Sequence, residues 1–217
     1  MINLNYFFVG AKNAKLKTIK IPNTNSNLSG QKTLFEKNLP KLLTVKDALS
    51  DILELEPFRT HNGKNGEESF KEYPEPPKTV YQEYLRKNSD KLYDHIAPNH
   101  SQLVVDRISH LKQGKNHKSL PPEYQLKGGY SNIYGRLHLE RPAGTITGNC
   151  GCVSAPGKFI HPIQNKALSV REAARLQSFP DDYRFFGCAR DKYKQVGNSV
   201  PPLMAYAVAR TVKKVLH

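Results

Sequence analysis

The sequence predicts a mixed α/β fold with few strands and a long closing helix, and three stretches support this prediction. Residues 6–10 form a short run of aromatic and β-branched side chains that ends in glycine, which is typical of a buried strand. Ser169 and Glu172 have the spacing of a capping box, in which each side chain binds the other's free backbone N–H, and so predict a helix start. Near the end of the chain, Pro201 opens an apolar stretch with helical spacing.

The first of these helices is expected to cover residues 170–178. It ends before Phe179-Pro180, because proline disfavours helical torsions in the residue that precedes it. The closing helix is expected from about Pro201, with Asn198 or Ser199 as its cap. Its predicted buried face consists of Leu203, Met204, Ala207, Val208, Val212 and Val215.

Shorter helices are expected earlier in the chain. Thr44 and Asp47 offer a second capping pattern, which apolar residues follow at helical spacing up to Leu53. Two amphipathic stretches, 81–92 and 102–112, predict further helices. The polar connections between these stretches carry Asn, Ser, Gly and Pro, as surface loops do.

Composition limits the functions that the chain can perform. It has 217 residues, with 33 Lys and Arg against 19 Asp and Glu, which gives a net charge of +14. This excess favours a polyanionic partner such as nucleic acid, and a merely soluble lysine-rich surface is the alternative. No apolar run reaches the roughly 18 residues that a membrane span needs, and the first residues lack a signal-peptide pattern. The three cysteines form no disulfide framework, which indicates a reducing cytoplasm.

Two contiguous stretches carry a family resemblance. Residues 171–181 read Arg-Glu-Ala-Ala-Arg-Leu-Gln-Ser-Phe-Pro-Asp and resemble the ninth conserved motif of DNA cytosine-5 methyltransferases. Residues 195–202 read Gln-Val-Gly-Asn-Ser-Val-Pro-Pro and resemble the tenth, in the order and spacing of that family. The alternative is that both are ordinary capped helices of another α/β domain. The motif residues with an expected structural role are Arg171, Glu172, Arg175, Gln195 and Gly197.

The resemblance implies a fold and a domain organisation. The chain would be the C-terminal fragment of a Rossmann-like methyltransferase fold, with few strands and a closing helix, into which a mixed α+β target recognition domain is inserted. Residues 1–57 would hold the end of the catalytic-domain sheet and a lead-in helix, and residues 58–152 the target recognition domain. Residues 153–217 would carry the ninth and tenth motifs back to the catalytic domain.

The resemblance also implies a DNA-binding segment before the ninth motif. Residues 141–148, Arg-Pro-Ala-Gly-Thr-Ile-Thr-Gly, resemble the end of the target recognition domain, where a Thr-Ile or Thr-Leu pair lies beside the flipped nucleotide. Thr145 and Ile146 take those positions, and a threonine hydroxyl can hold a phosphate. Arg136 and Arg141 are candidates for a phosphate or guanine contact, with a surface salt bridge as the alternative.

Two further groups of residues give weaker signals. Residues 114–118, Gly-Lys-Asn-His-Lys, form a basic glycine turn that fits either contact with a nucleic-acid backbone or an exposed turn without a ligand. Cys150 and Cys152, with His161 nearby, have a Cys-x-Cys spacing without a second cysteine pair. This spacing misses the usual zinc patterns, so no metal site is expected.

The tenth motif implies S-adenosylmethionine as the cofactor. In the family, the loop before the closing helix lines the cofactor pocket, and Phe179, Asn198, Ser199 and Val200 occupy the matching positions. An amide, a hydroxyl and backbone groups suit the polar amino-acid end of this cofactor. Asn198 and Ser199 can also cap helices, and the two roles are compatible.

The chemistry of the family requires groups that this sequence lacks. Methylation at carbon 5 of cytosine needs a base flipped out of the duplex and a cysteine thiolate that attacks carbon 6. In the family this cysteine follows a proline, and a Glu-Asn-Val motif assists at the ring. None of the three cysteines here follows a proline, and Glu-Asn-Val is absent from the sequence.

We therefore expect a DNA-recognition subunit of a split DNA cytosine-5 methyltransferase of the restriction-modification type, without a catalytic residue of its own and inactive alone. It would bind double-stranded DNA and complete the S-adenosylmethionine pocket of a catalytic subunit that carries the Pro-Cys and Glu-Asn-Val motifs. Its place would be the cytoplasm of a prokaryote, near the nucleoid. The alternatives are a non-enzymatic DNA-binding or regulatory module derived from such an enzyme, and a truncated remnant of a longer one.

Overall fold

The computed structural model describes residues 42–60, 70–126, 128 and 130–216. The chain divides into two compact units. Leu43–Ser199 forms one of them, called the main unit below, and the other includes Val200 and the closing helix α6, Pro202–Leu216. The strand predicted at residues 6–10 lies outside the described residues. In the described part of the chain, no helix is both long and apolar enough to cross a membrane.

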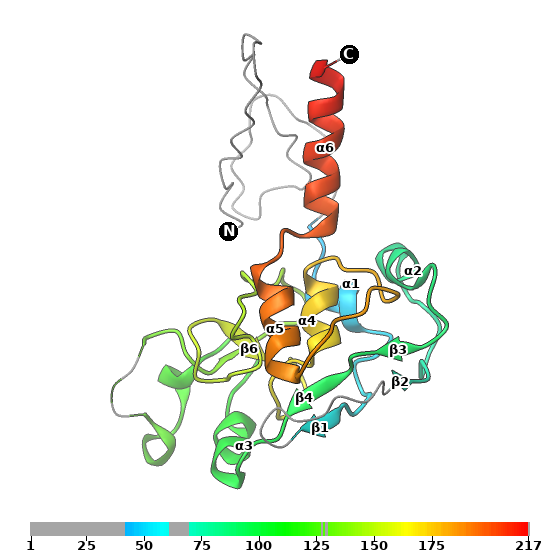
Figure 1. The fold of residues 1–217 in the computed structure, drawn as a ribbon. Coiled ribbons are helices and arrows are strands. Elements are labelled where there is room, and N and C mark those ends of the chain that lie inside the picture. The colour runs from blue at the N-terminus through cyan, green and yellow to red at the C-terminus, as the bar shows by residue number, and fades with distance from the viewer. Residues whose placement is uncertain (1–41, 61–69, 127, 129, 217) are drawn as a thin grey trace. The chain divides into compact units, whose positions relative to one another are not determined.

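Short helices and strands make up the main unit, as Figure 1 shows. The helices are α1 Val45–Leu49, α2 Val80–Arg86, α3 Gln102–Ser109, α4 Val170–Leu176 and α5 Ala189–Asn198, with single 3-10 turns at η1 His117–Ser119 and η2 Pro122–Tyr124. The strands are β1 Phe58–Thr60, β2 Phe70–Lys71, β3 Leu92–Tyr93, β4 Ile96–Pro98, β5 Gly135–Arg136 and β6 Lys158–Ile160.

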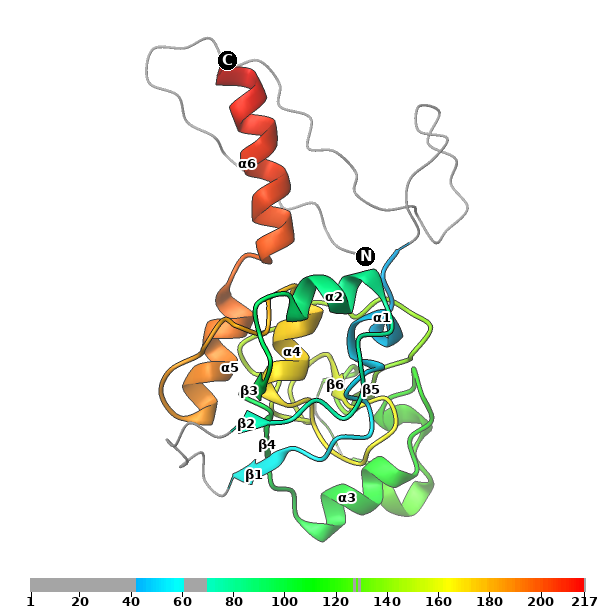
Figure 2. The ribbon, with the colours of Figure 1, turned by 90° about the vertical axis from the view of Figure 1, so that its right-hand side faces the viewer.

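The described strands pair two by two, so the main unit is an α/β structure with few strands, as predicted. Strands β1 and β4 pair in parallel, β2 and β3 antiparallel, and β5 and β6 in parallel. Helix α4 lies between α1 and α5, and both α4 and α5 contact β4 (Figures 1 and 2). The two motifs singled out in the sequence therefore lie side by side.

Two helices begin at the capping boxes that the sequence predicted. At α1, the Thr44 hydroxyl accepts the backbone N–H of Asp47 at 3.2 Å, and the Asp47 carboxylate accepts the N–H of Thr44 at 2.8 Å. At α4, Ser169 and Glu172 make the same exchange at 3.1 and 2.7 Å. Helix α4 is slightly shorter than predicted, because Gln177 already has the torsions of a terminal cap.

The end of helix α2 differs from the prediction. Helix α2 ends at Arg86, and the last residues of the predicted stretch 81–92 turn back and enter β3. The reason is local, since Asn88, Ser89 and Asp90 compete with helical hydrogen bonds through their own side chains. The Ser89 hydroxyl donates to the carbonyl of Lys91 at 2.7 Å, which closes the turn.

The capping role predicted for Asn198 and Ser199 is wrong. Both residues end α5, a helix that the sequence analysis did not predict, and neither begins the closing helix. Ser199 is the C-terminal cap of α5, and its N–H and its hydroxyl both donate to the carbonyl of Val196, the hydroxyl at 2.6 Å. Helix α6 begins at Pro202, in agreement with the predicted role of proline in its first turn.

One hydrophobic core runs through the main unit from α1 to α5. It joins Val45 and Leu49 of α1 to Phe159 of β6, Val170 of α4 and Val196 of α5, all of them 1% exposed or less. Burial of such side chains contributes about 1.5–3 kcal/mol each. A smaller cluster packs beneath α3 and consists of Ile108, Leu111, Leu120, Ile133, Tyr134, Val153, Ile160 and Ala167.

This core crosses the boundaries that the family resemblance implied. Residues from segments 1–57, 58–152 and 153–217 share it, so these segments are not separate compact units within Leu43–Ser199. Their division by function stays a prediction. In α6, the predicted apolar face has Leu203 at 37% exposed and Met204 half-buried. Ala207, Val208 and Val212 of the same face are half-buried as well.

Candidate functional site

One aromatic side chain, Tyr193, fixes the position of helix α5, which contains the first residues of the tenth motif. Tyr193 is buried, and its hydroxyl donates to the carbonyl of Leu168 at 2.7 Å, with the carbonyl of Ile96 at 3.2 Å. A Cβ added to Gly151 would lie 2.5 Å from the Tyr193 ring, so the backbone of residue 151 packs directly on that ring. These contacts fix the position of the C-terminal end of α5, where Asn198 and Ser199 lie.

A contact between two glycines joins the candidate DNA-binding loop to the tenth motif. A Cβ on Gly197 would overlap the backbone of Thr147 and Gly148, closer than the 3.0 Å limit of real contacts. In return, a Cβ on Gly148 would lie 3.4 Å from the side-chain oxygen of Asn198 and 3.4 Å from Cα of Lys194. Only glycine at position 197 permits this approach of backbone to backbone. The loop and the end of α5 therefore form one surface.

Within this loop, the two predicted contact residues differ in exposure. Thr145 is exposed, while Ile146 is 4% exposed and belongs to the main core. The turn after it closes through a hydrogen bond from Cys150 N–H to the carbonyl of Thr147 at 3.0 Å. Ile146 thus anchors the loop and leaves the Thr145 hydroxyl free to meet a ligand.

The four predicted cofactor residues lie in different surroundings. Asn198 is exposed, so its amide is available to a polar ligand. The Ser199 hydroxyl gives its proton to Val196 and keeps only acceptor capacity. Phe179 is 7% exposed and packs against the ring of Phe185 at 5.2 Å between centroids. Val200 is 50% exposed and belongs to the second unit. Asn198 and Ser199 suit the amino-acid end of S-adenosylmethionine, and Phe179 offers little surface to any ligand.

The two arginines named as DNA contacts are also in contrasting positions. Arg141 is exposed. Arg136 is 5% exposed, and its guanidinium donates to the carbonyl of Ile108 at 2.8 Å and to the side-chain oxygen of Asn165 at 2.7 Å. It also reaches the carbonyl of Pro162 at 3.3 Å. Arg136 therefore joins three segments of the main unit, and in this conformation it is not available to DNA.

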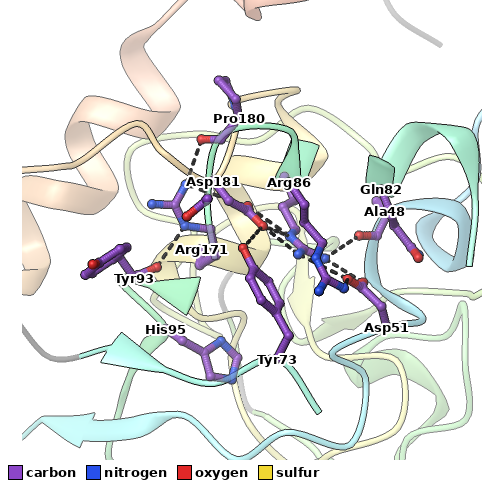
Figure 3. Close-up of polar contacts among 12 residues, drawn as sticks. Ala48, Asp51, Tyr73, Gln82, Arg86, Tyr93, His95, Arg171, Pro180 and Asp181 are labelled. Carbon is purple, nitrogen blue, oxygen red and sulfur yellow. Dashed lines mark hydrogen bonds and ion pairs between the residues drawn. The ribbon is translucent and has the colours of Figure 1, made fainter. Parts of the chain in front are cut away.

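The ninth motif supplies two buried arginines. Arg175 makes bidentate contact with Asp181 and also binds Asp51, with closest distances of 2.6 Å to each. Burial disfavours the charged form of Arg175, but the two aspartates outweigh it and raise the pKa of Arg175. Tyr73 donates its hydroxyl to Asp181 at 2.8 Å, so the carboxylate is shared between α4 and a distant segment (Figure 3).

The second buried arginine, Arg171, binds backbone carbonyls. It donates to Tyr93 at 2.8 Å, to Pro180 at 3.1 Å and to Tyr183 at 2.7 Å, and Figure 3 shows it between the first two. It also pairs with the carboxylates of Asp94 at 3.3 Å and of Asp181 at 3.9 Å. Arg171 therefore fixes the chain on both sides of the motif, from strand β3 to the segment that leads into α5.

Glu172 is the centre of a second buried cluster. Lys166 donates to both of its carboxylate oxygens at 2.8 Å, and each side chain is at most 1% exposed. His161 accepts the backbone N–H groups of Gln164 at 2.9 Å and Ile163 at 3.3 Å on Nδ1. Its proton must therefore be on Nε2, which lies 3.7 Å from Glu172.

His95 is a second histidine of this cluster. Its Nε2 donates to the carbonyl of Leu55 at 3.0 Å, and in the neutral ring Nδ1 then accepts the Ser169 hydroxyl at 3.0 Å. Burial lowers the pKa of His95 to about 4 and that of His161 to about 3. Burial alone would raise the pKa of Glu172, but Lys166 and the two histidines outweigh it and hold that pKa well below its usual range. At neutral pH the cluster thus has one ion pair and two neutral histidines.

Gln195 forms two hydrogen bonds with the loop that precedes α5. Its amide nitrogen donates to the carbonyl of Phe186 at 2.6 Å, and its oxygen accepts the N–H of the same residue at 3.4 Å. The loop before α5 is thereby fixed to the helix, although Phe186 itself is 73% exposed. The sequence analysis missed Asp94, Lys166 and His95, which complete these networks. The partners of Asp94 and His95 are distant in sequence, and Lys166 precedes the ninth motif, so the motif spacing indicated none of the three.

The three cysteines differ in environment. Cys150 is fully buried, and burial raises the pKa of its thiol to about 12. Cys152 is exposed and lies 3.1 Å from the Ser154 hydroxyl. The Cys188 thiol donates to the Asp191 carboxylate at 3.0 Å. In the described ranges, no group of three or more His, Cys, Asp or Glu side chains could hold a metal ion.

Comparison with known proteins gives the family. The profile of the family described as C-5 cytosine-specific DNA methylase matches residues 6–214. The chain belongs to the C-5 cytosine-specific DNA methylase family. Its C-5 methylase relatives include the type II methyltransferase M.DdeI of Desulfomicrobium norvegicum, which is 31% identical over 95% of this chain and 49% of its own length. The type II methyltransferase M1.HphI of Haemophilus parahaemolyticus is 35% identical over 66% of this chain and 40% of its own length.

A solved structure supports the fold assignment. It is described as a prophage-encoded DNA modification methyltransferase of E. coli, and it matches with a TM-score of 0.57 and 22% identity. The match covers 82% of this chain and 49% of that one. This chain thus spans about half the length of the curated relatives and of the solved structure that it matches.

Proposed function

We propose that this chain is the DNA-recognition subunit of a split DNA cytosine-5 methyltransferase of the restriction-modification type. One observation carries the proposal. The family match covers residues 6–214, yet none of the three cysteines is suited to be the nucleophile of the reaction. The catalytic cysteine is then supplied by a second polypeptide that carries the Pro-Cys and Glu-Asn-Val motifs.

The environments of the three cysteines support the proposal that the nucleophile comes from a second polypeptide. A nucleophilic cysteine needs an accessible thiol with a lowered pKa. Cys150 has the opposite properties, because it is fully buried and its pKa is raised to about 12. Cys152 follows Gly151 and Cys188 follows Gly187, and within the described residues no basic side chain hydrogen-bonds either thiol.

The proposed roles of this chain are recognition and positioning. Thr145 and Arg141 contact the DNA, and Ile146 holds their loop in the core. Asn198 and Ser199 contribute to the pocket for S-adenosylmethionine, which supplies the methyl group, and the family resemblance also assigns Phe179 and Val200 to it. Because Gly197 and Gly148 pack backbone to backbone, binding of the flipped base and of the cofactor is positioned by the same rigid element.

The test is a reconstitution of methyl transfer. The full chain and the product of a neighbouring gene that encodes Pro-Cys and Glu-Asn-Val are purified separately and together, and incubated with mixed-sequence duplex DNA and labelled S-adenosylmethionine. We expect label in DNA only when both polypeptides are present. The matched control replaces the cysteine of the partner's Pro-Cys motif by serine, which abolishes transfer and leaves the complex intact.

Two outcomes would contradict the proposal. Methyl transfer by the lone chain would place the nucleophile here. DNA binding without transfer under any pairing would favour the second reading, a DNA-binding or regulatory module derived from a methyltransferase.

A further inference from the structure

Two neighbouring segments of the main unit carry no carboxylate. Residues 107–122 contain Arg107, Lys112, Lys115 and Lys118 but neither Asp nor Glu. Residues 124–139 also lack acidic side chains. In a chain with 19 Asp and Glu, two such stretches leave the local charge strongly positive wherever they meet.

The structure brings the two segments together in antiparallel fashion. Arg136 N–H donates to the carbonyl of Lys115 at 2.9 Å, and Gly114 N–H donates to the carbonyl of Arg136 at 3.1 Å. Further along, His117 N–H donates to the carbonyl of Ile133 at 3.4 Å. The turn at residues 112–118, called the basic turn below, is therefore held to β5 and its flanking residues by its backbone and by the side chains of Gln113 and Asn116, and its lysine side chains are not needed to keep it there.

The basic turn continues into the candidate DNA-binding loop. Gly114 has φ of +79°, so the turn requires glycine there, and a Cβ at this position would lie 3.5 Å from the His138 ring and 3.9 Å from the Arg141 guanidinium. Arg141 begins the segment that leads to Thr145. The basic turn therefore lies beside residues 138 and 141, at the start of the segment that leads to the exposed Thr145.

The lysines of the basic turn have no partner for their charge. Lys112, Lys115 and Lys118 are exposed, and among the described residues none of them forms an ion pair. Elsewhere in the main unit lysines do find carboxylates, as Lys192 does with Asp94 at 2.6 Å and Lys46 with Glu140 at 3.0 Å. Three unpaired charges on one rigid turn repel each other, and a polyanion removes this cost.

We infer that Lys112, Lys115 and Lys118 form a phosphate-binding surface for duplex DNA beside the target site, an inference that rests on the proposed DNA-recognition function. Lysine ammonium groups on flexible stems bind phosphates as point charges without reading the bases. The basic turn therefore contributes affinity and register, and the loop around Thr145 is left to contribute sequence preference. Arg136 takes no part, because it is 5% exposed and its two terminal amino groups already donate to carbonyls and to Asn165.

The test compares the salt dependence of DNA binding in charge-removal variants of the full chain. The test variant is Lys112→Gln with Lys115→Gln and Lys118→Gln. The matched control removes three charges around α2, on another side of the main unit from α3 and the basic turn (Figures 1 and 2), as Lys78→Gln with Lys87→Gln and Lys91→Gln. Affinity for a random-sequence duplex pool is measured over a series of salt concentrations, and the bound duplexes are sequenced.

Each phosphate contact that is lost reduces the slope of log affinity against log salt by about 0.9, so the test variant is expected to lose about 2–3 from its slope. The control variant keeps the wild-type slope, and both variants enrich the same sequences as wild type. Replacement of the three lysines by arginine keeps the charge and restores the slope, which separates charge from folding. Equal slopes in the test variant and wild type would overturn the inference and leave the proposed function standing. Absence of DNA binding by the wild-type chain at every salt concentration, alone and with its partner, would overturn both.

Discussion

The close approach of Gly197 to the Thr147–Gly148 backbone predicts an unusual response to alanine. In a helix, glycine to alanine normally stabilises by about 0.5–1 kcal/mol, because alanine loses less backbone entropy. Gly197 lies in α5, so helix propensity alone predicts that Gly197→Ala is stabilising. The structure predicts the opposite sign, since the new methyl group would overlap backbone atoms of residues 147 and 148.

The size of the expected loss in stability depends on whether the atoms next to the new methyl group can move away. Overpacking of a core costs about 1–3 kcal/mol, and flexible side chains reduce that cost by rotating away. Here the obstructing atoms are backbone, so the loop and the helix end must separate, and we expect a loss of about 3 kcal/mol in the free energy of unfolding. For a domain of this size, such a loss lowers Tm by about 6–12 °C.

Thermal unfolding of the full chain measures the effect. The chain has no tryptophan, so far-ultraviolet circular dichroism is the appropriate signal. Gly144→Ala is the matched control, because it lies in the same loop and nothing is within 4 Å of the added Cβ. We expect the control to stay within about 0.5 kcal/mol of wild type. A Gly197→Ala chain that melts at or above the wild-type temperature would refute the contact between α5 and the loop.

Three further predictions test other parts of the main unit. Arg175→Ala leaves the buried Asp51 and Asp181 with only Arg86 at 3.1 Å and Arg171 at 3.9 Å as counter-charges. It is expected to lower the free energy of urea unfolding by about 3 kcal/mol, whereas a change within error would show that the network is not formed. Because the folded-state pKa values of His95 and His161 lie below the usual value of about 6.5, the unfolded state binds more protons, so stability is full above that pH and falls below it. Between roughly pH 6 and pH 4.5, each histidine is expected to lower the free energy of unfolding by about 1.4 kcal/mol for each pH unit of acidification. A free energy of urea unfolding that stays constant over this range would contradict the burial of both histidines as neutral rings. Ile146→Ala is expected to lower the free energy of unfolding by about 2–5 kcal/mol, because Ile146 is part of the core. Thr145→Ala is expected to leave Tm unchanged and to lower DNA affinity in a binding titration. A loss of stability in Thr145→Ala and a loss of DNA affinity alone in Ile146→Ala would contradict the roles assigned to the two residues.

The sequence predicted those parts of the fold that depend on neighbours in the chain. The capping boxes at Thr44 and Ser169 were found because both partners lie three residues apart, within one helical turn. The proline start of α6 is local in the same way. Helix α5 was missed because its buried side depends on long-range contacts. Lys192 reaches Asp94 on a distant turn, and Tyr193 reaches the carbonyl of Leu168.

The sequence predicted only part of the candidate site, because contacts between distant residues decide which side chains are buried. Motif spacing indicated Asn198 and Thr145, which are exposed where a ligand can meet them. Arg136 was also expected to contact DNA, because a guanidinium can pair bidentately with a guanine edge. Instead the side chain is buried and donates to the carbonyls of Ile108 and Pro162, which no sequence pattern connects to residue 136.

The core shared by helices α1, α4 and α5 restricts how chains of this kind can acquire a new target sequence. A recombination junction at residue 152 would exchange Gly148 without Gly197, and Ile146 without the residues of α4 and α5 that belong to the same core. If the two parental sequences differ at these positions, the hybrid would place an added side-chain atom at a backbone contact that has no room for it. Hybrids that inherit Leu43–Ser199 whole avoid this conflict, so viable crossovers are expected to fall outside that block.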